Sequence, residues 1–329
     1  MSFQAPLVGQ ERAVQFLRSA IANDKVGHAY LFSGPVGIGK LALAINFSRW
    51  LNCQYEVAAD ACGCESCRKI TSGVHSDIKL IGEDRSVRSI KKADVMELRS
   101  WLILRPLEAK KKVAIVDVAE RFTEEAANAF LKSLEEPPAN VVLILLVHDT
   151  GRMLGTILSR TIEVVLRPVS SETIVAKLGP DKGPDEVLYV ARRARGSVGA
   201  AQELLRVGAF EEKNAIISKA MMSGWACVFT PGAKKDVYKD VLDVAQGFFR
   251  DCILVMAGDT SLCYNQDRVC DIRHVVDWVP RSDLYKMIEV IDEALCGIEK
   301  NYNQRLSATR VAMIAEKIDA RLMSVEQER

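Results

Sequence analysis

Gly34, Gly39 and Lys40 complete the glycine-rich pattern G-x-x-x-x-G-K in this chain. The pattern follows a short apolar run at 28–32 and precedes the amphipathic segment 41–47, an order that favours strand, loop and helix. In that geometry the N–H groups of the loop and of the helix N-terminus point at an anion. A chance glycine turn is the competing interpretation, and the lysine and the flanking segments argue against it. The sequence therefore predicts a phosphate-binding loop in an α/β fold.

Two positions that an ATPase uses for hydrolysis carry apolar residues. Leu41 follows the loop lysine, where a Ser or Thr hydroxyl would hold Mg²⁺. The apolar run 113–117 ends in Asp117, which is suited to hold the metal, but Val118 follows where a Glu would orient the attacking water. On an extended segment Glu120 would share the face of Val118 but lie roughly 7 Å further along, a poor position for a substitute base. We expect no ATP hydrolysis, whereas nucleotide binding stays open.

Composition limits the alternatives. The chain has 329 residues, 49% of them hydrophobic and 26% charged, as expected for a globular protein of two or three domains. The formal net charge of +1 gives no global attraction to nucleic acid, so a DNA contact would need a local basic patch. We expect no membrane span and no secretory signal. Apolar runs suited to a parallel sheet, with helical periods between most of them, lie at 29–32, 78–81, 113–118, 141–147 and 162–166.

The most specific element is the string EEAANAFLKSLEEPP at 124–138, followed by the segment ILSR that ends in Ser159 and Arg160. Together with the glycine loop and the acidic strand, these segments resemble the bacterial clamp-loader subunits of DNA polymerase III, which belong to the AAA+ group. Within that family the chain is most similar to the delta-prime type, and less to the ATP-hydrolysing gamma/tau type. The resemblance covers nearly the whole chain.

The resemblance implies a fold and a domain order. It implies an AAA+ domain of RecA-like α/β type at 1–167, a small helical lid at 168–208, and an all-α collar domain at 209–329 that assembles the complex. Nucleotide, ATP or ADP, would contact a degenerate site. The residues of that site are Gly34, Pro35, Gly37, Gly39, Lys40 and Asp117.

The resemblance also implies a role in an assembly. Arg160 would project as an arginine finger into the ATP site of a neighbouring subunit, so the chain could serve its neighbour's hydrolysis without hydrolysing ATP itself. Gly199 stands where active relatives carry a lid arginine that senses the γ-phosphate. The implied partners are gamma/tau and delta subunits in a hetero-pentamer, the sliding clamp and primer-template DNA, in the bacterial cytoplasm at the replisome. Polymerase activity would belong to another subunit of the holoenzyme.

Four cysteines lie within fifteen residues, in the pattern C-x8-C-x-C-x2-C. Four thiolates so close together suit a tetrahedral Zn²⁺ site, although free thiols or a redox pair stay open. Family members carry a zinc module at this place, but only Gly63 separates the second cysteine from the third, where two residues are usual. The expected ligands are Cys53, Cys62, Cys64 and Cys67.

Three functions are compatible with parts of this pattern. The first is the non-hydrolysing delta-prime-type subunit. The second is an active gamma/tau-type ATPase, which Leu41, Val118 and Gly199 argue against. The third is an unrelated zinc-bearing P-loop protein that uses nucleotide as a structural ligand, which the string at 124–138 and the Ser-Arg segment argue against.

Overall fold

The computed structural model describes residues 7–55, 62–82, 89–179, 182–229, 234–299 and 302–326. The chain divides into two compact units. The first contains the residues up to Ile174 together with Arg195–Ala200, and the second contains Val175–Ala194 and the residues from Ala201 onward. The division therefore falls within helices α7 (Ser171–Leu178) and α9 (Val198–Arg206). The finer division into three domains, at 167 and 208, stays a prediction.

The first unit is built on a five-stranded sheet in the order β2-β3-β4-β1-β5, in which every neighbouring pair is parallel. Each strand coincides closely with an apolar run of the sequence, so the expected parallel sheet is confirmed. The strands are β1 (Ala29–Ser33), β2 (Ile78–Ile81), β3 (Lys112–Val116), β4 (Val141–Val147) and β5 (Ile162–Val165).

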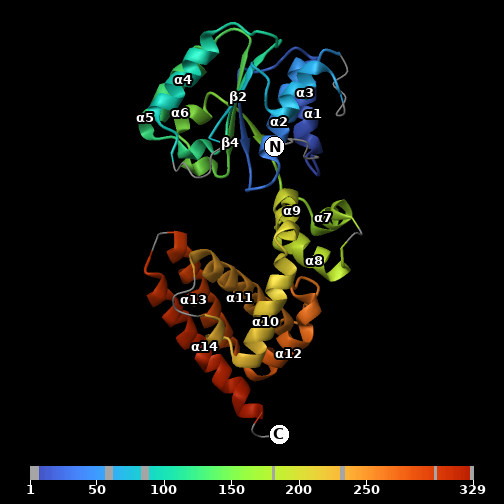
Figure 1. Ribbon diagram of the computed structural model, residues 1–329, viewed down its shortest axis with the longest axis vertical. Coiled ribbons are helices and arrows are strands. Elements are labelled where there is room, and N and C mark those ends of the chain that lie inside the picture. Colours follow the sequence, from blue (N-terminus) through green and yellow to red (C-terminus); the bar gives the residue numbers. More distant parts are fainter. Residues whose placement is uncertain are drawn as a thin grey trace. The chain divides into compact units, whose positions relative to one another are not determined.

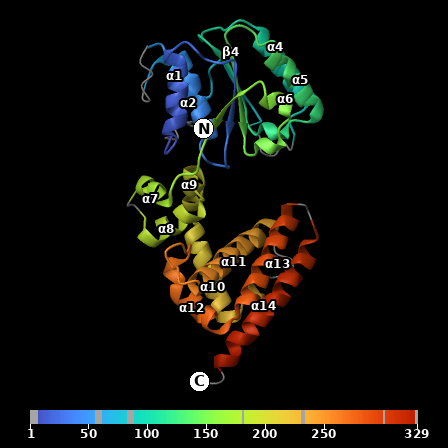
Figure 2. The same ribbon diagram turned by 180° about the vertical axis from the view of Figure 1, so that it is seen from behind.

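Helices cover both faces of this sheet (Figure 1). Helices α1, α2 and α3 lie on one face, and α4, α5 and α6 lie on the other (Figures 1 and 2). Alternate strand residues enter the two apolar layers: Phe32 packs with the α1–α2 side, and Leu31 with the α4–α5 side. Burial on both faces explains the continuous apolar strands. The helices are α1 (Glu11–Ala22), α2 (Lys40–Asn52), α3 (Glu65–Ser72), α4 (Lys92–Ile103), α5 (Glu124–Glu135) and α6 (Gly155–Leu158).

In its described residues the second unit contains helices joined by loops and no strand, which confirms the expected all-α C-terminal region. Its core is centred on Trp225, whose ring centroid is 4.8 Å from those of Phe248 and Phe249. The buried Asp319 carboxylate accepts hydrogen bonds from the backbone N–H groups of Trp225 and Ala226, which fixes the turn before α11. Its remaining helices are α8 (Pro184–Arg193), α10 (Ala209–Ser223), α11 (Lys235–Met256), α12 (Val269–Trp278), α13 (Arg281–Glu299) and α14 (Gln304–Glu326).

Candidate functional site

The glycine loop connects β1 to α2, as the sequence predicts. Lys40 is the first residue of α2, and Gly39 precedes it with φ +104°, a left-handed conformation that favours glycine. Gly37 is also left-handed, at φ +74°. Strand, loop and helix N-terminus therefore have the arrangement of an anion-binding loop.

The side chain of Lys40 is buried and fully engaged by the chain itself. Its Nζ lies 2.8 Å from the Pro35 carbonyl oxygen, donates also to the Gly34 carbonyl, and lies 2.8 Å from Nδ1 of His148 at the end of β4. Burial lowers the pKa of Lys40 to about 8, against the opposing charges of Glu120 and Asp117. Three acceptors match the three hydrogens of an ammonium group, so a nucleotide phosphate would have to displace at least one of them.

The segment after β3 corrects the expectation for Glu120. The strand ends at Val116, and Val118 has φ +51°, so the chain turns into a 3₁₀ helix at Ala119–Arg121 instead of continuing extended. Glu120 therefore does not follow Val118 along one face. Its carboxylate accepts hydrogen bonds from the backbone N–H groups of His148 and Asp149, the latter at 3.0 Å.

Asp117 and Glu120 both lie within electrostatic range of Lys40 and His148. The pKa of His148 is lowered, first by burial and then by the charge of Lys40. The expected Asp117 is thus brought to the loop, together with Glu120 and His148. In this arrangement Oε1 of Glu120 accepts both backbone N–H groups, whereas Oε2 is buried and has no hydrogen-bond partner in the described residues.

The two other departures from an ATPase have a clear structural setting. Leu41 packs against the apolar layer between the sheet and α1–α2, so it contributes to the core at the point where a hydroxyl would face the metal. Gly199 lies directly against the loop, since a Cβ atom there would come 2.8 Å from the Gly37 carbonyl oxygen. A Cβ atom on Gly37 would in turn come 2.6 Å from Ser197 Oγ. Residues 197–199 therefore pack directly on the glycine loop, and there is no room for a side chain on Gly199 or Gly37.

Arg160 lies in the turn that follows α6 and is exposed. Its Nη1 donates to the Thr156 carbonyl oxygen at 3.0 Å and to Ser159 Oγ at 3.3 Å, and its Nη2 is 3.1 Å from Glu135 Oε1. The hydroxyl of Thr161 donates a hydrogen bond to the Ile157 carbonyl oxygen and so closes the turn.

The four cysteines of the N-terminal unit come together. All four sulfur atoms lie within 4.8 Å of one another, and Cys53 Sγ is 3.5 Å from Cys62 Sγ. A tetrahedral zinc site with Zn–S bonds of about 2.3 Å requires sulfurs about 3.8 Å apart, so the cluster fits the ion. The single residue between Cys62 and Cys64 does not prevent this convergence.

The surroundings of Cys64 suit a thiolate, whereas burial raises the pKa of Cys67. Cys64 caps the N-terminus of α3. Although burial raises its pKa, hydrogen bonds from the backbone N–H groups of Gln54 and Cys67 outweigh this and lower the pKa of Cys64 to about 6. Lys110 Nζ donates to the Cys53 carbonyl oxygen at 2.6 Å and brings a positive charge close to the cluster.

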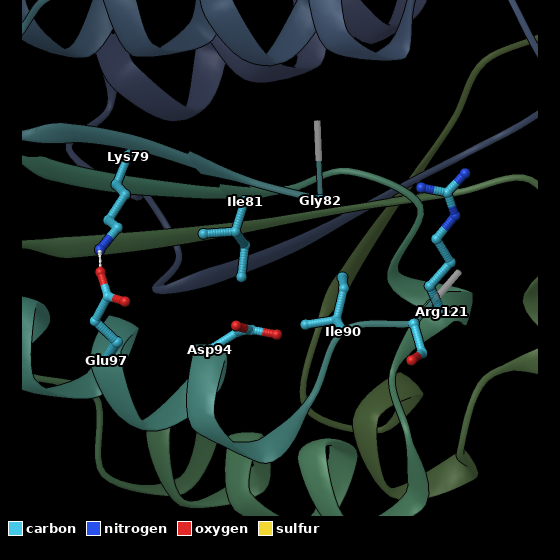
Figure 3. A pocket seen from close by; sticks show the side chains of 8 residues that line it. Lys79, Ile81, Gly82, Ile90, Asp94, Glu97 and Arg121 are labelled. Carbon is cyan, nitrogen blue, oxygen red and sulfur yellow. Dashed lines mark hydrogen bonds and ion pairs between the residues drawn. The ribbon is translucent and has the colours of Figure 1, made fainter. Parts of the chain in front are cut away.

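A pocket that sequence reasoning missed opens between β2 and α4 (Figure 3). It has a volume of about 250 Å³, with Ile81 and Ile90 on its apolar side. Lys79 and Glu97 point toward one another across it and form an ion pair at 2.6 Å (Figure 3). A second pocket of about 410 Å³ lies between α1 and β5. Both are formed by residues distant in sequence, so no local pattern signals them.

Comparisons with known proteins agree with these observations. The family described as "DNA polymerase III, delta subunit" matches residues 9–170. The DNA polymerase III subunit delta' of Bacillus subtilis is 30% identical over 321 residues, which cover 93% of this chain and 96% of that protein. The DNA polymerase III subunit tau/gamma of Haemophilus influenzae is 34% identical over 203 residues, which cover 59% of this chain and 29% of that protein.

Solved structures agree on the fold. The DNA polymerase III gamma subunit-related protein of Thermotoga maritima has a TM-score of 0.50 and 19% identity, covering 94% of this chain and 99% of that one.

In the described part of this chain, no helix combines the length and apolar character needed to cross a lipid bilayer.

Proposed function

Since the chain belongs to the DNA polymerase III delta-prime family of AAA+ proteins, we propose that it is a non-hydrolysing clamp-loader subunit that supplies Arg160 to the ATP site of a neighbouring subunit. The match to a delta-prime subunit over nearly the full length of both chains supports this type of subunit, whereas the tau/gamma relative matches over a smaller part. The packing of Leu41 against the apolar layer, at the position where a hydroxyl would hold Mg²⁺, is the observation that carries the non-hydrolysing part.

Several independent features support the loss of hydrolysis. Leu41 offers no hydroxyl to Mg²⁺, Val118 cannot polarise water, and Glu120 is tied to the end of β4. The closure of Gly199 onto the loop leaves no space for an arginine that would sense a γ-phosphate. Each feature alone could be compensated, but an active gamma/tau-type ATPase would need all of them replaced. ATP or ADP could still bind, at a cost in free energy for displacing the partners of Lys40.

A subunit that does not hydrolyse ATP can still be needed for ATP hydrolysis by the neighbouring subunit. A guanidinium placed on a γ-phosphate stabilises the charge of the transition state and can raise the rate by roughly 10³ to 10⁵. Arg160 is suited to this because its side chain is 38% exposed at the end of a short, well-bonded turn. Within this proposal Arg160 is a catalytic residue in trans.

The cysteine cluster is proposed to hold one Zn²⁺ through Cys53, Cys62, Cys64 and Cys67. Its role would be structural, because four thiolates fill a tetrahedral ion and leave no open position for a substrate. The cluster joins the end of α2 to the start of α3, two elements whose connection at 56–61 lies outside the described residues. Zinc would therefore stabilise the fold of this module, because its few apolar residues do not stabilise it on their own.

The partners follow from the same premise. We infer gamma/tau and delta subunits in a hetero-pentamer, with the all-α region 209–329 as the collar domain that assembles it. We also infer action on the sliding clamp and primer-template DNA in the bacterial cytoplasm. The chain itself would carry neither ATPase nor polymerase activity, and any polymerase activity would be that of the holoenzyme.

The test is DNA- and clamp-stimulated ATP turnover by a clamp-loader complex rebuilt with this chain. Arg160→Ala should lower turnover roughly tenfold or more while the complex stays assembled. Arg152→Ala is the matched control, because Arg152 is an exposed arginine nearby that pairs with Asp149. Equal turnover in the wild type and in an assembled Arg160→Ala complex would contradict the role in trans.

A further inference from the structure

Arg160 is held by acceptors from two separate elements. The Thr156 carbonyl oxygen and Ser159 Oγ belong to the same turn as the arginine, and both accept from Nη1. Glu135 is the last residue of α5, 25 positions earlier in the sequence, and its Oε1 is 3.1 Å from Nη2. Two of the five guanidinium N–H groups therefore donate hydrogen bonds, and Nη2 forms an ion pair with the Glu135 carboxylate.

The remaining donors are sufficient for a second ligand. In the described part of the chain neither the Nε–H nor an Nη2 hydrogen of Arg160 donates a hydrogen bond, and Nη2 is engaged only in the ion pair with Glu135. Two N–H groups of a planar guanidinium form the fork that binds phosphate oxygens. The contacts to α5 and to the α6 turn thus fix the guanidinium plane and leave one fork available.

We propose that Glu135 is a positioning residue that orients Arg160 for the γ-phosphate of the neighbouring subunit. The inference rests on the proposed role of Arg160 in trans. A flexible arginine must lose side-chain entropy to reach one geometry, and a partner that restricts it beforehand lowers this cost at the moment of reaction. Glu135 is 48% exposed, and an exposed ion pair contributes little to folding stability. Its effect should therefore appear in turnover, with no change in stability.

The experiment is a double-mutant cycle in the rebuilt clamp-loader complex. Wild type, Glu135→Gln, Arg160→Ala and the double variant are compared for kcat and for the KM of ATP, with assembly checked by size-exclusion chromatography. Glu136→Gln is the matched control, because Glu136 is exposed at the next position and makes no ion pair in the described part of the chain. We expect Glu135→Gln to lower kcat about twofold to fivefold with KM unchanged, and to have no effect when Arg160 is already alanine.

The outcomes separate this proposal from the one on which it rests. If Arg160→Ala lowers turnover but Glu135→Gln matches Glu136→Gln, the positioning role is overturned and the role of Arg160 stands. An equal loss from Glu135→Gln in both backgrounds would mean that Glu135 acts through something other than Arg160. A rise in kcat would mean that the carboxylate restrains the arginine, which also overturns the proposal. If Arg160→Ala changes nothing, both proposals fail together.

Discussion

Lys40 Nζ and His148 Nδ1 lie 2.8 Å apart, so the lysine of the glycine loop is hydrogen-bonded to the residue that follows β4. An ammonium group only donates, which makes His148 Nδ1 the acceptor and leaves the ring proton on Nε2. The lowered pKa of His148 favours this neutral form. The contact joins the N-terminus of α2 to the end of β4.

The first prediction concerns the pH dependence of stability through Lys40. Its pKa is about 8 in the fold, against 10.5 for an ordinary lysine, so the unfolded chain binds more protons between these two values. Stability attributable to this group should therefore rise with pH from about 8 to 10.5 and be flat below 8. Lys40→Met removes the titrating group while keeping much of its volume.

Urea unfolding of wild type and Lys40→Met at a series of pH values measures this difference. Relative to the variant, wild type should gain a few kcal/mol, about 1.4 for each unit of pKa shift, across that window. Other lysines and the cysteines titrate in both proteins and cancel in the comparison. Parallel curves for the two proteins would show that Lys40 is not desolvated in solution.

A second prediction tests the contact between residue 199 and the loop. Gly199→Ala places a Cβ atom 2.8 Å from a backbone oxygen of Gly37, and backbone cannot move away cheaply. We expect a destabilisation of about 1–3 kcal/mol, seen as a lower urea midpoint with an unchanged slope. Gly183→Ala is the control, because no atom lies within 4 Å of its added Cβ and its φ is −59°. Equal midpoints for the two variants would refute the close packing.

The third prediction concerns the metal. The purified chain should contain one Zn²⁺, and Cys64→Ser should lose it and lower the melting temperature of the first unit. Cys227→Ser is the control, since Cys227 is exposed in the second unit and should affect neither quantity. A chelator should reproduce the effect of Cys64→Ser in the wild type. Unchanged zinc content and melting temperature in Cys64→Ser would instead indicate free thiols.

The sheet and the cysteine cluster could be predicted because their signals are local. Continuous apolar runs mark strands covered on both faces, and four closely spaced cysteines converge almost whatever the loop between them does. The position of Glu120 could not be predicted from the sequence. Val118 adopts a left-handed conformation that ends the extended segment, and a β-branched residue does not signal that conformation in a sequence. The hydrogen-bonding and ion-pair partners of Lys40 and Arg160 could not be predicted from the sequence either. His148 and Glu135 meet them only through the packing of β4 and α5.

The last prediction is that Leu41→Thr alone gives no ATP turnover. The substitution restores a hydroxyl at the place of the Mg²⁺ ligand, but Val118 still offers no group to orient water, and Glu120 stays bonded to the backbone of Asp149. It also removes an apolar side chain from the layer beside α1 and α2, so a modest loss of stability of about 1–2 kcal/mol should accompany it. Steady-state phosphate release by the isolated chain, with and without DNA, is the measurement. An active gamma/tau subunit serves as the positive control. Turnover above background in Leu41→Thr would show that a second group replaces the missing glutamate, and Glu120 would then be the first residue to mutate.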